Sequence, residues 1–95
     1  MQHLTAFQRD ILYVVTGMDE PYGLAIKAEL EEYYEGEINH GRLYPNLDAL
    51  VEQDLLEKGT LDQRTNSYEI TADGVAAIEQ RREWERESVS TADGV

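Results

Sequence analysis

Two short segments of the chain carry polar side chains that suit recognition of nucleic acids, and neither segment contains an acidic residue. They run from residue 38 to 47 and from 63 to 68. Arginine can donate two hydrogen bonds to guanine, asparagine can pair with adenine, and several polar groups can contact phosphates. With one lysine between the segments, the candidate contact residues are Asn39, His40, Gly41, Arg42, Tyr44, Pro45, Asn46, Lys58, Gln63, Arg64, Thr65 and Asn66.

These acid-free segments stand out because the chain as a whole is strongly acidic. It has 20 Asp and Glu residues against eight Lys and Arg, for a net charge of −12. Such a surface ordinarily repels DNA, since affinity for DNA rests on cations that meet phosphates. In molar salt, however, the screening length falls to about 3 Å, and abundant carboxylates keep a protein hydrated. We therefore favour a halophilic protein over an acidic surface that avoids DNA.

The same composition excludes several classes of function. We find no nucleophile–base pair, phosphate-cradling loop or metal cluster, so we expect no enzyme, no catalytic residue and no cofactor. Cysteine is absent, and His3 and His40 form no metal-binding spacing. The longest apolar run, residues 11–15, is far shorter than the roughly 20 residues that span a bilayer. We expect a cytoplasmic protein without membrane contact.

Four helices and one hairpin are predicted to position the polar segments. Thr5 and Gln8 form a capping box before a stripe of apolar residues with helical spacing. The second helix should bury Tyr33 and end at Gly36, and Asn39 suits the N-cap of the third. The predicted ranges are 5–17, 23–34 and 39–54 for the first three helices, 56–61 and 67–71 for two strands, and 72–88 for the last helix.

This order of elements is typical of a winged helix-turn-helix, although other α+β folds share it. We expect an α+β, mostly helical chain in which three helices and a two-stranded β-hairpin, the wing, form a DNA-binding domain at residues 1–71. A C-terminal dimerisation helix should follow at 72–88, and residues 89–95 should form a disordered tail. In a helix-turn-helix, the start of the recognition helix enters the major groove, and the first polar segment lies there.

Several candidate residues also have a purely structural interpretation. Asn39 caps the third helix whether or not DNA binds. Tyr44 suits packing as well as contact with a phosphate, and Arg64 could be an ordinary solvated arginine of a loop. Pro45 lies near the helix start, where a missing N–H costs little.

From residue 21 onward the chain carries three motifs that occur together in one family. They are Tyr22-Gly23 and Ile26-Lys27 in the second helix, Gly41, Leu43-Tyr44-Pro45, Leu47 and Leu50 in the third, and Arg64, Tyr68, Ile70-Thr71 and Gly74 in the wing. The most specific part is the Leu-Tyr-Pro element, because a proline inside a helix is otherwise disfavoured. In these residues the sequence resembles the PadR family of transcriptional regulators, with isoleucine in place of the usual leucine in the wing motif.

The resemblance implies a sequence-specific DNA-binding regulator, typically a repressor, that acts as a homodimer on a pseudo-palindromic operator. Its expected partners are double-stranded DNA and a second copy of the chain. One helix follows the wing, as in a short subfamily, and Asp54 stands where many relatives have glycine. The alternative is a winged-helix module that binds proteins and has lost DNA binding.

The resemblance also places the dimer interface on the last helix, with the first helix alongside. Trp84, six residues beyond Ile78, is expected near the same helix face, where a large apolar ring suits an interface anchor. A small-molecule effector, known among relatives, and an incidental exposed ring are the alternatives for Trp84; the sequence itself does not support an effector. The expected interface residues are Phe7, Ile11, Val75, Ile78, Arg82 and Trp84.

Overall fold

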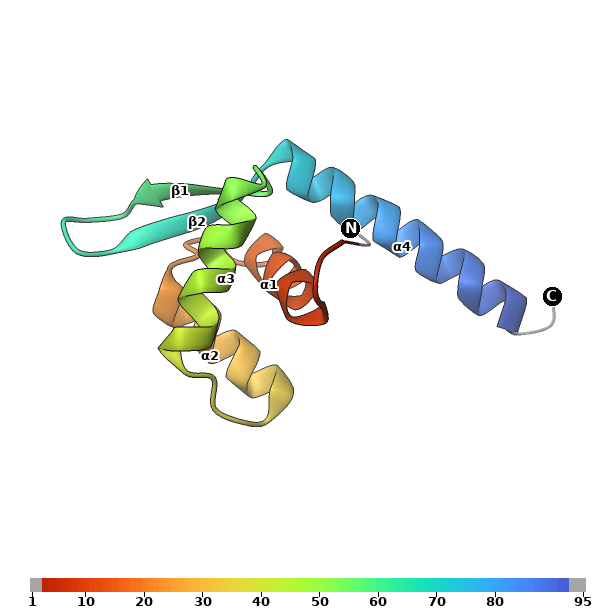
Figure 1. Cartoon of the computed structure of the whole chain (residues 1–95), viewed down its shortest axis with the longest axis horizontal. Coiled ribbons are helices and arrows are strands. Elements are labelled where there is room, and N and C mark those ends of the chain that lie inside the picture. Colours follow the sequence, from red (N-terminus) through yellow and green to blue (C-terminus); the bar gives the residue numbers. More distant parts are fainter. Residues whose placement is uncertain (1–2, 93–95) are drawn as a thin grey trace.

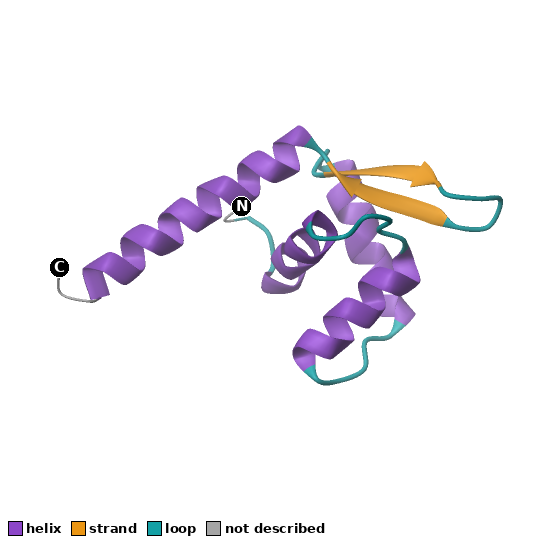
Figure 2. Ribbon diagram, turned by 180° about the vertical axis from the view of Figure 1, so that it is seen from behind, coloured by secondary structure: helices purple, strands orange, loops and turns teal. Residues whose placement is uncertain are grey.

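The computed structural model describes residues 3–92 and has the predicted order of three helices, a hairpin and a last helix. Figures 1 and 2 show the hairpin projecting from one end of the molecule and the last helix from the other, with the first three helices between them. The elements are α1 (Ala6–Thr16), α2 (Gly23–Tyr34), α3 (His40–Glu52), β1 (Leu56–Thr60), β2 (Asn66–Ile70) and α4 (Ala72–Ala92). The mostly helical winged-helix fold is therefore confirmed.

The N-termini of α1 and α3 are capped as the sequence predicts. The Thr5 hydroxyl accepts a hydrogen bond from the Gln8 N–H at 3.1 Å, and the Gln8 side chain accepts one from the Thr5 N–H at 3.1 Å. At α3, the Asn39 side chain accepts a hydrogen bond from the Arg42 N–H at 2.8 Å. Each cap satisfies N–H groups that have no partner inside the helix, which fixes where the helix begins.

One apolar core joins the first three helices to the hairpin and to the start of α4. Removing these side chains from water is the main force that holds the elements together. Its fully buried large side chains are Ile11 and Leu12 of α1, Ile26 and Leu30 of α2, Leu43, Leu47 and Leu50 of α3, and Leu56 of β1.

The hairpin is fastened to the beginning of α2. Strands β1 and β2 are antiparallel and pair Leu56 with Ile70 at one end and Thr60 with Asn66 at the other. On its other edge, β2 forms a bridge between Ser67 and Tyr22, and the Tyr68 N–H donates to the Pro21 carbonyl at 2.7 Å. The wing is therefore held against the loop before α2, on the side of the molecule where α3 lies.

Helix α4 is longer than predicted. It continues to Ala92, so residues 89–92 are helical and the expected tail at 89–95 is wrong over that range; residues 93–95 lie outside the described residues. The sequence offers no glycine or proline between Gly74 and Gly94 that would end the helix. Ion pairs one turn apart also support it: Arg81–Glu85 at 3.6 Å, Arg82–Glu79 at 3.6 Å and Arg86–Glu83 at 2.6 Å.

The end of α2 also differs from the prediction. Tyr33 is 73% exposed instead of buried, and Glu35, not Gly36, adopts the left-handed conformation that ends the helix, with φ of 57°. Among the described residues, no helix combines the length and apolarity needed to cross a membrane.

Candidate nucleic-acid interface

The first residues of α3 present most of the predicted polar groups on the surface. Asn39, His40, Gly41 and Arg42 are all exposed. The His40 ring stacks on the Tyr44 ring, with centroids 5.4 Å apart and planes 6° from parallel. The Asn39 cap fixes the beginning of α3, and the first turn carries no negative charge. That combination suits entry into the major groove.

Arg42 does not extend freely into solvent. Its guanidinium lies 3.9 Å from the centroid of the Phe7 ring, a cation–π contact with α1. Phe7 in turn stacks on Tyr34 at 6.2 Å, and the Tyr34 hydroxyl donates a hydrogen bond to the Asp10 carboxylate. Burial and then this hydrogen bond raise the pKa of Tyr34 to about 12, so the hydroxyl keeps its proton. The sequence did not reveal this chain of contacts beneath Arg42, because it joins residues of three different helices.

Asn46 is occupied within the chain. Its side-chain amide donates to the Arg42 carbonyl at 2.7 Å and accepts from the Gln8 amide at 3.0 Å. Both of its polar groups therefore fasten α3 to itself and to α1. Each group can form one more hydrogen bond, so the base contact expected of Asn46 stays a prediction.

Tyr44 packs against the beginning of α2 at a point where only glycine fits. A Cβ atom added to Gly23 would overlap the Tyr44 hydroxyl and come within 2.8 Å of ring atoms Cε1 and Cζ. The close approach explains why a Tyr-Gly pair in the second helix accompanies a Leu-Tyr-Pro element in the third. Tyr44 is half-buried, whereas Pro45 is exposed on the outer side of the same turn.

Glu31 fixes the loop that leads into α3, a role that the sequence did not reveal. Its carboxylate accepts from the Lys27 ammonium at 2.8 Å and from the Ile38 backbone N–H at 2.9 Å. The hydrogen bond from Lys27, followed by that from Ile38, lowers the pKa of Glu31. Lys27 is therefore paired within α2, and the residue before the Asn39 cap is tied to α2 through Glu31.

The wing loop, residues 61–65, is shaped by its own hydrogen bonds. The Leu61 N–H donates to the Thr65 carbonyl at 2.8 Å, and the Arg64 N–H donates to the Asp62 carboxylate at 2.8 Å. The latter bond is the main cause of a lowered pKa of Asp62. The Asp62 carboxylate is therefore hydrogen-bonded within the wing loop, while Gln63 and Arg64 are exposed.

Lys58 is less available than the sequence suggests. Its ammonium lies 4.0 Å from the Asp48 carboxylate of α3 and 5.8 Å from the centroid of the Tyr68 ring. The lysine side chain remains exposed, and an exposed ion pair of this length contributes little free energy. Lys58 can therefore leave Asp48 for another anion at little cost.

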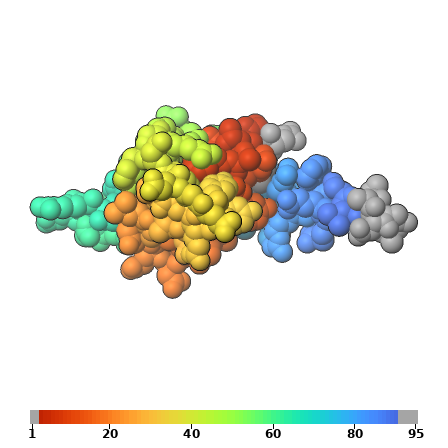
Figure 3. Space-filling view, turned by 90° about the horizontal axis from the view of Figure 1, so that it is seen from below, coloured from red at the N-terminus to blue at the C-terminus, as the bar shows by residue number. Residues whose placement is uncertain are grey.

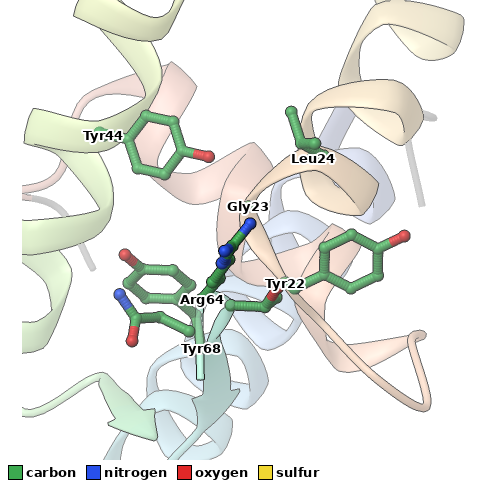
Figure 4. A pocket seen from close by; sticks show the side chains of 8 residues that line it. Tyr22, Gly23, Leu24, Tyr44, Arg64 and Tyr68 are labelled. Carbon is green, nitrogen blue, oxygen red and sulfur yellow. The ribbon is translucent and has the colours of Figure 1, made fainter. Parts of the chain in front are cut away.

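Recognition helix and wing meet at one cavity of about 220 Å³. Figure 4 shows Tyr44 and Tyr68 on one side of it and the Arg64 side chain reaching in from the wing, whereas the Tyr22 ring points away. Among the lining residues, Arg64 is the charged one and no carboxylate is present. The walls of this space, hereafter the wing cavity, are Tyr22, Gly23, Leu24, Tyr44, Arg64, Thr65, Asn66 and Tyr68.

The residues expected at a dimer interface divide into two groups. Phe7 and Ile11 are buried in the core of the single chain, which corrects the interface role expected of them, and Ile78 is 6% exposed. Val75 and Trp84 are 42% and 55% exposed. Arg82 is also exposed and pairs with Glu79 within α4.

Trp84 does not share the face of Ile78. At about 100° per residue, six residues turn a helix through about 600°, which leaves the two side chains about 120° apart. The Trp84 ring instead lies under the Arg81 guanidinium, 4.3 Å from the ring centroid. A groove of about 320 Å³ runs between α1 and α4, with Tyr13, Val75 and Ile78 in its walls. Figure 3 shows that α4 then projects beyond the body of the molecule.

Comparison with known proteins gives a consistent result. A sequence model of the Transcriptional regulator PadR-like family matches residues 11–80. A complex structure of RosR-S1 has a TM-score of 0.84 and 52% identity, covering 95% of this chain and 88% of that one. A structure of RosR from H. salinarum has a TM-score of 0.83 and 52% identity, covering 95% and 90%. A search of curated proteins gives no significant match.

A PadR-like transcription factor from B. fragilis shares the fold alone, with a TM-score of 0.80 at 21% identity over 92% of this chain and 86% of that one. The RosR neighbour from H. salinarum supports the halophilic interpretation of the acidic composition. The family model matches most of this chain, and a solved relative is 52% identical to it. The chain therefore belongs to the PadR-like family of transcriptional regulators.

Proposed function

We propose that the protein is a homodimeric repressor that binds a pseudo-palindromic operator through α3 and the wing. The observation that carries the proposal is that the first turn of α3, with exposed Arg42, and the wing cavity, with exposed Arg64, both lack carboxylates in a chain of net charge −12. Arg42 would contact bases from the start of α3, and Arg64 would contact the backbone or minor groove from the wing. Such a role places the protein with the chromosome in the cytoplasm.

The shape of α4 supports dimerisation. The second half of the helix projects past the rest of the chain, and it exposes Trp84 and Val89, each more than half accessible. A second copy would cover these side chains and the groove between α1 and α4. Two-fold symmetry then predicts half-sites about one or two turns of DNA apart.

The decisive experiment compares Arg42→Ala with Arg64→Ala and their double variant in a DNA-binding titration. The DNA is a duplex selected from a random pool with the wild-type protein. Each arginine contact is worth about 1–3 kcal/mol, so we expect the double variant to lose at least about 30-fold in affinity. Arg86→Ala, which removes an exposed arginine of α4, is the matched control and should bind as wild type.

Two results would contradict the proposal. One is wild-type affinity in the folded double variant. The other is failure of the random pool to yield any enriched sequence, which would favour a winged-helix module that binds proteins instead.

The acidic composition adds a second test of the same function. Ordinary DNA-binding proteins lose affinity steeply as salt rises, because the complex releases condensed counterions. Here the carboxylates outside the interface repel DNA at low salt, and added potassium chloride screens that repulsion. We expect affinity to fall only weakly with potassium chloride, or to rise. A steep conventional loss would count against the halophilic interpretation.

A further inference from the structure

The charged end of Arg42 has an aromatic neighbour in place of a carboxylate. The Lys and Arg side chains of α2, β1 and α4 each form an ion pair with an acid. Arg42 forms none with the residues that the structure describes, although the chain has 20 Asp and Glu residues. Its guanidinium lies over the Phe7 ring, 3.9 Å from the centroid. A cation–π contact of this kind holds a long side chain and leaves its in-plane N–H donors available.

Tyr34 steadies the Phe7 ring and also occupies the acid of α1. That acid, Asp10, follows Phe7 by three residues, which places both side chains on one side of the helix. The Tyr34 ring stacks on Phe7 at 6.2 Å, and the Tyr34 hydroxyl donates a hydrogen bond to the Asp10 carboxylate. Burial and then Asp10 raise the pKa of Tyr34, and the nearby charge of Arg42 partly offsets the rise. Tyr34 therefore engages a carboxylate that would otherwise attract the Arg42 guanidinium.

The same turn of α1 also holds the backbone of Arg42. Gln8, the residue after Phe7, donates from its side-chain amide to the Asn46 side chain at 3.0 Å. Asn46 in turn donates to the Arg42 carbonyl at 2.7 Å. Helix α1 thus fixes Arg42 at both ends, through Phe7 at the guanidinium and through Gln8 and Asn46 at the main chain. An arginine that is ordered before binding loses less conformational entropy when it contacts a base.

We propose that Phe7 is a positioning residue for DNA recognition, whose ring holds the Arg42 guanidinium in the orientation from which it contacts a base. The proposal rests on the proposed function, because it assigns Phe7 a task in the base contact of Arg42. The Phe7 ring takes one face of the guanidinium, and the N–H edge remains free to donate two hydrogen bonds to guanine. Phe7 itself is 6% exposed and need not touch DNA.

The first test is Phe7→Leu, which keeps an apolar side chain in the core and removes the aromatic face. Binding is measured for two duplexes, one selected with the wild-type protein and one of random sequence. Ordering one long side chain costs about 0.5–1.5 kcal/mol, so affinity for the selected duplex should fall about three- to tenfold. Affinity for the random duplex should change little, because phosphate contacts do not need this orientation. In the Arg42→Ala background, Phe7→Leu should have no further effect.

Leu12→Val is the matched control for a loss of stability. Leu12 is fully buried in α1, and its side chain lies about 140° around the helix from Phe7. Shortening it should lower the Tm and leave the affinities for both duplexes unchanged. A merely structural role of Phe7 would give the same pattern as this control.

A second arm follows the Nε–H signal of Arg42 by NMR in the free protein. With the guanidinium over the ring, this signal should be shifted by the ring current, and Phe7→Leu should remove the shift. Tyr34→Phe keeps the ring stack but frees the Asp10 carboxylate to draw Arg42 away, so it should also move the signal and weaken selected binding. Adding Asp10→Asn should reverse both effects.

The proposal is overturned if folded Phe7→Leu binds the selected duplex as wild type, or if it weakens binding equally when position 42 is alanine. Tighter binding by Phe7→Leu would also overturn it, since Phe7 would then withhold Arg42 from DNA. If Phe7→Leu does not fold, Tyr34→Phe with and without Asp10→Asn decides in its place. Failure of the wild-type protein to select any sequence would sink the proposed function instead, and the NMR arm would still test whether Phe7 orients Arg42.

Discussion

Replacing Gly23 by alanine tests the contact that joins α2 to the recognition helix. The new Cβ would overlap the Tyr44 hydroxyl and lie 2.8 Å from two ring atoms, so the ring must move. Overpacking of this kind costs about 1–3 kcal/mol. The obstacle is the far end of a half-buried side chain, and alanine also reduces the entropy of the unfolded chain, which offsets part of the cost. We therefore expect a loss near the lower end, about 1 kcal/mol.

The displacement should affect DNA binding more than stability. A loss of about 1 kcal/mol lowers the Tm of a domain of this size by about 4–8 °C, which thermal denaturation resolves easily. A Tyr44 ring pushed away from α2 would also leave its stack on His40 and withdraw its hydroxyl from the wing cavity. We expect DNA affinity to fall by about tenfold, the equivalent of one lost hydrogen bond to a charged group.

The double variant Gly23→Ala with Tyr44→Leu separates this contact from any general effect of alanine. Leucine lacks the ring atoms that the Cβ would meet, so most of the stability loss should disappear in the Tyr44→Leu background. The reasoning is refuted if the effects of Gly23→Ala on Tm are the same with tyrosine and with leucine at position 44. It is also refuted if the single variant is as stable as wild type and binds DNA equally well.

Three further changes test other parts of the structure. Asn39→Ala removes the N-cap of α3 and should lower the free energy of unfolding by about 1 kcal/mol in urea denaturation, with Asn66→Ala as an exposed control. Glu31→Gln should flatten the pH dependence of the free energy of unfolding. Because the pKa of Glu31 is lowered in the folded protein, its carboxylate stabilises the fold above the unfolded pKa near 4.5, and this stabilisation is lost as the pH falls through the folded pKa. Unfolding measured across acidic pH would detect the difference. Trp84→Ala should weaken self-association by at least about tenfold in sedimentation experiments, and an unchanged dimer would remove Trp84 from the interface.

The parts of the fold that the sequence predicted correctly depend on neighbours within one or two helical turns. The Thr5–Gln8 capping box and the Asn39 cap follow from local residue types, and so do the two strands, whose ends lie within one residue of the predicted positions. The length of α4 is also a local matter: no helix breaker is present before Gly94, so the polar residues after Glu87 continue the helix to Ala92. The face of Trp84 could likewise have been found from the helical period.

The contacts that the sequence did not reveal join residues far apart in the chain. Gln8 meets Asn46 across 38 positions, and Phe7 lies under Arg42 because α1 crosses α3 there. Spacing within one helix cannot signal such pairs, since they depend on how the helices pack. They matter because they hold polar groups of α3 in place: Asn46 is hydrogen-bonded to Gln8 and Arg42 lies over the Phe7 ring, whereas Asn39 and His40 are exposed.

The wing cavity gives a physical reason for motifs that lie far apart in the sequence. The Tyr-Gly pair of α2, the Leu-Tyr-Pro element of α3 and the Arg-x-x-x-Tyr motif of the wing each contribute to its wall through Gly23, Tyr44, Arg64 and Tyr68. Gly23 lets the Tyr44 ring approach, and the wing contributes the Arg64 charge and the Tyr68 ring. In a chain of net charge −12, attraction for DNA cannot come from a general positive field. It must come from donors concentrated where acids are absent, and that requirement makes the geometry of this cavity more important here than in a basic DNA-binding protein.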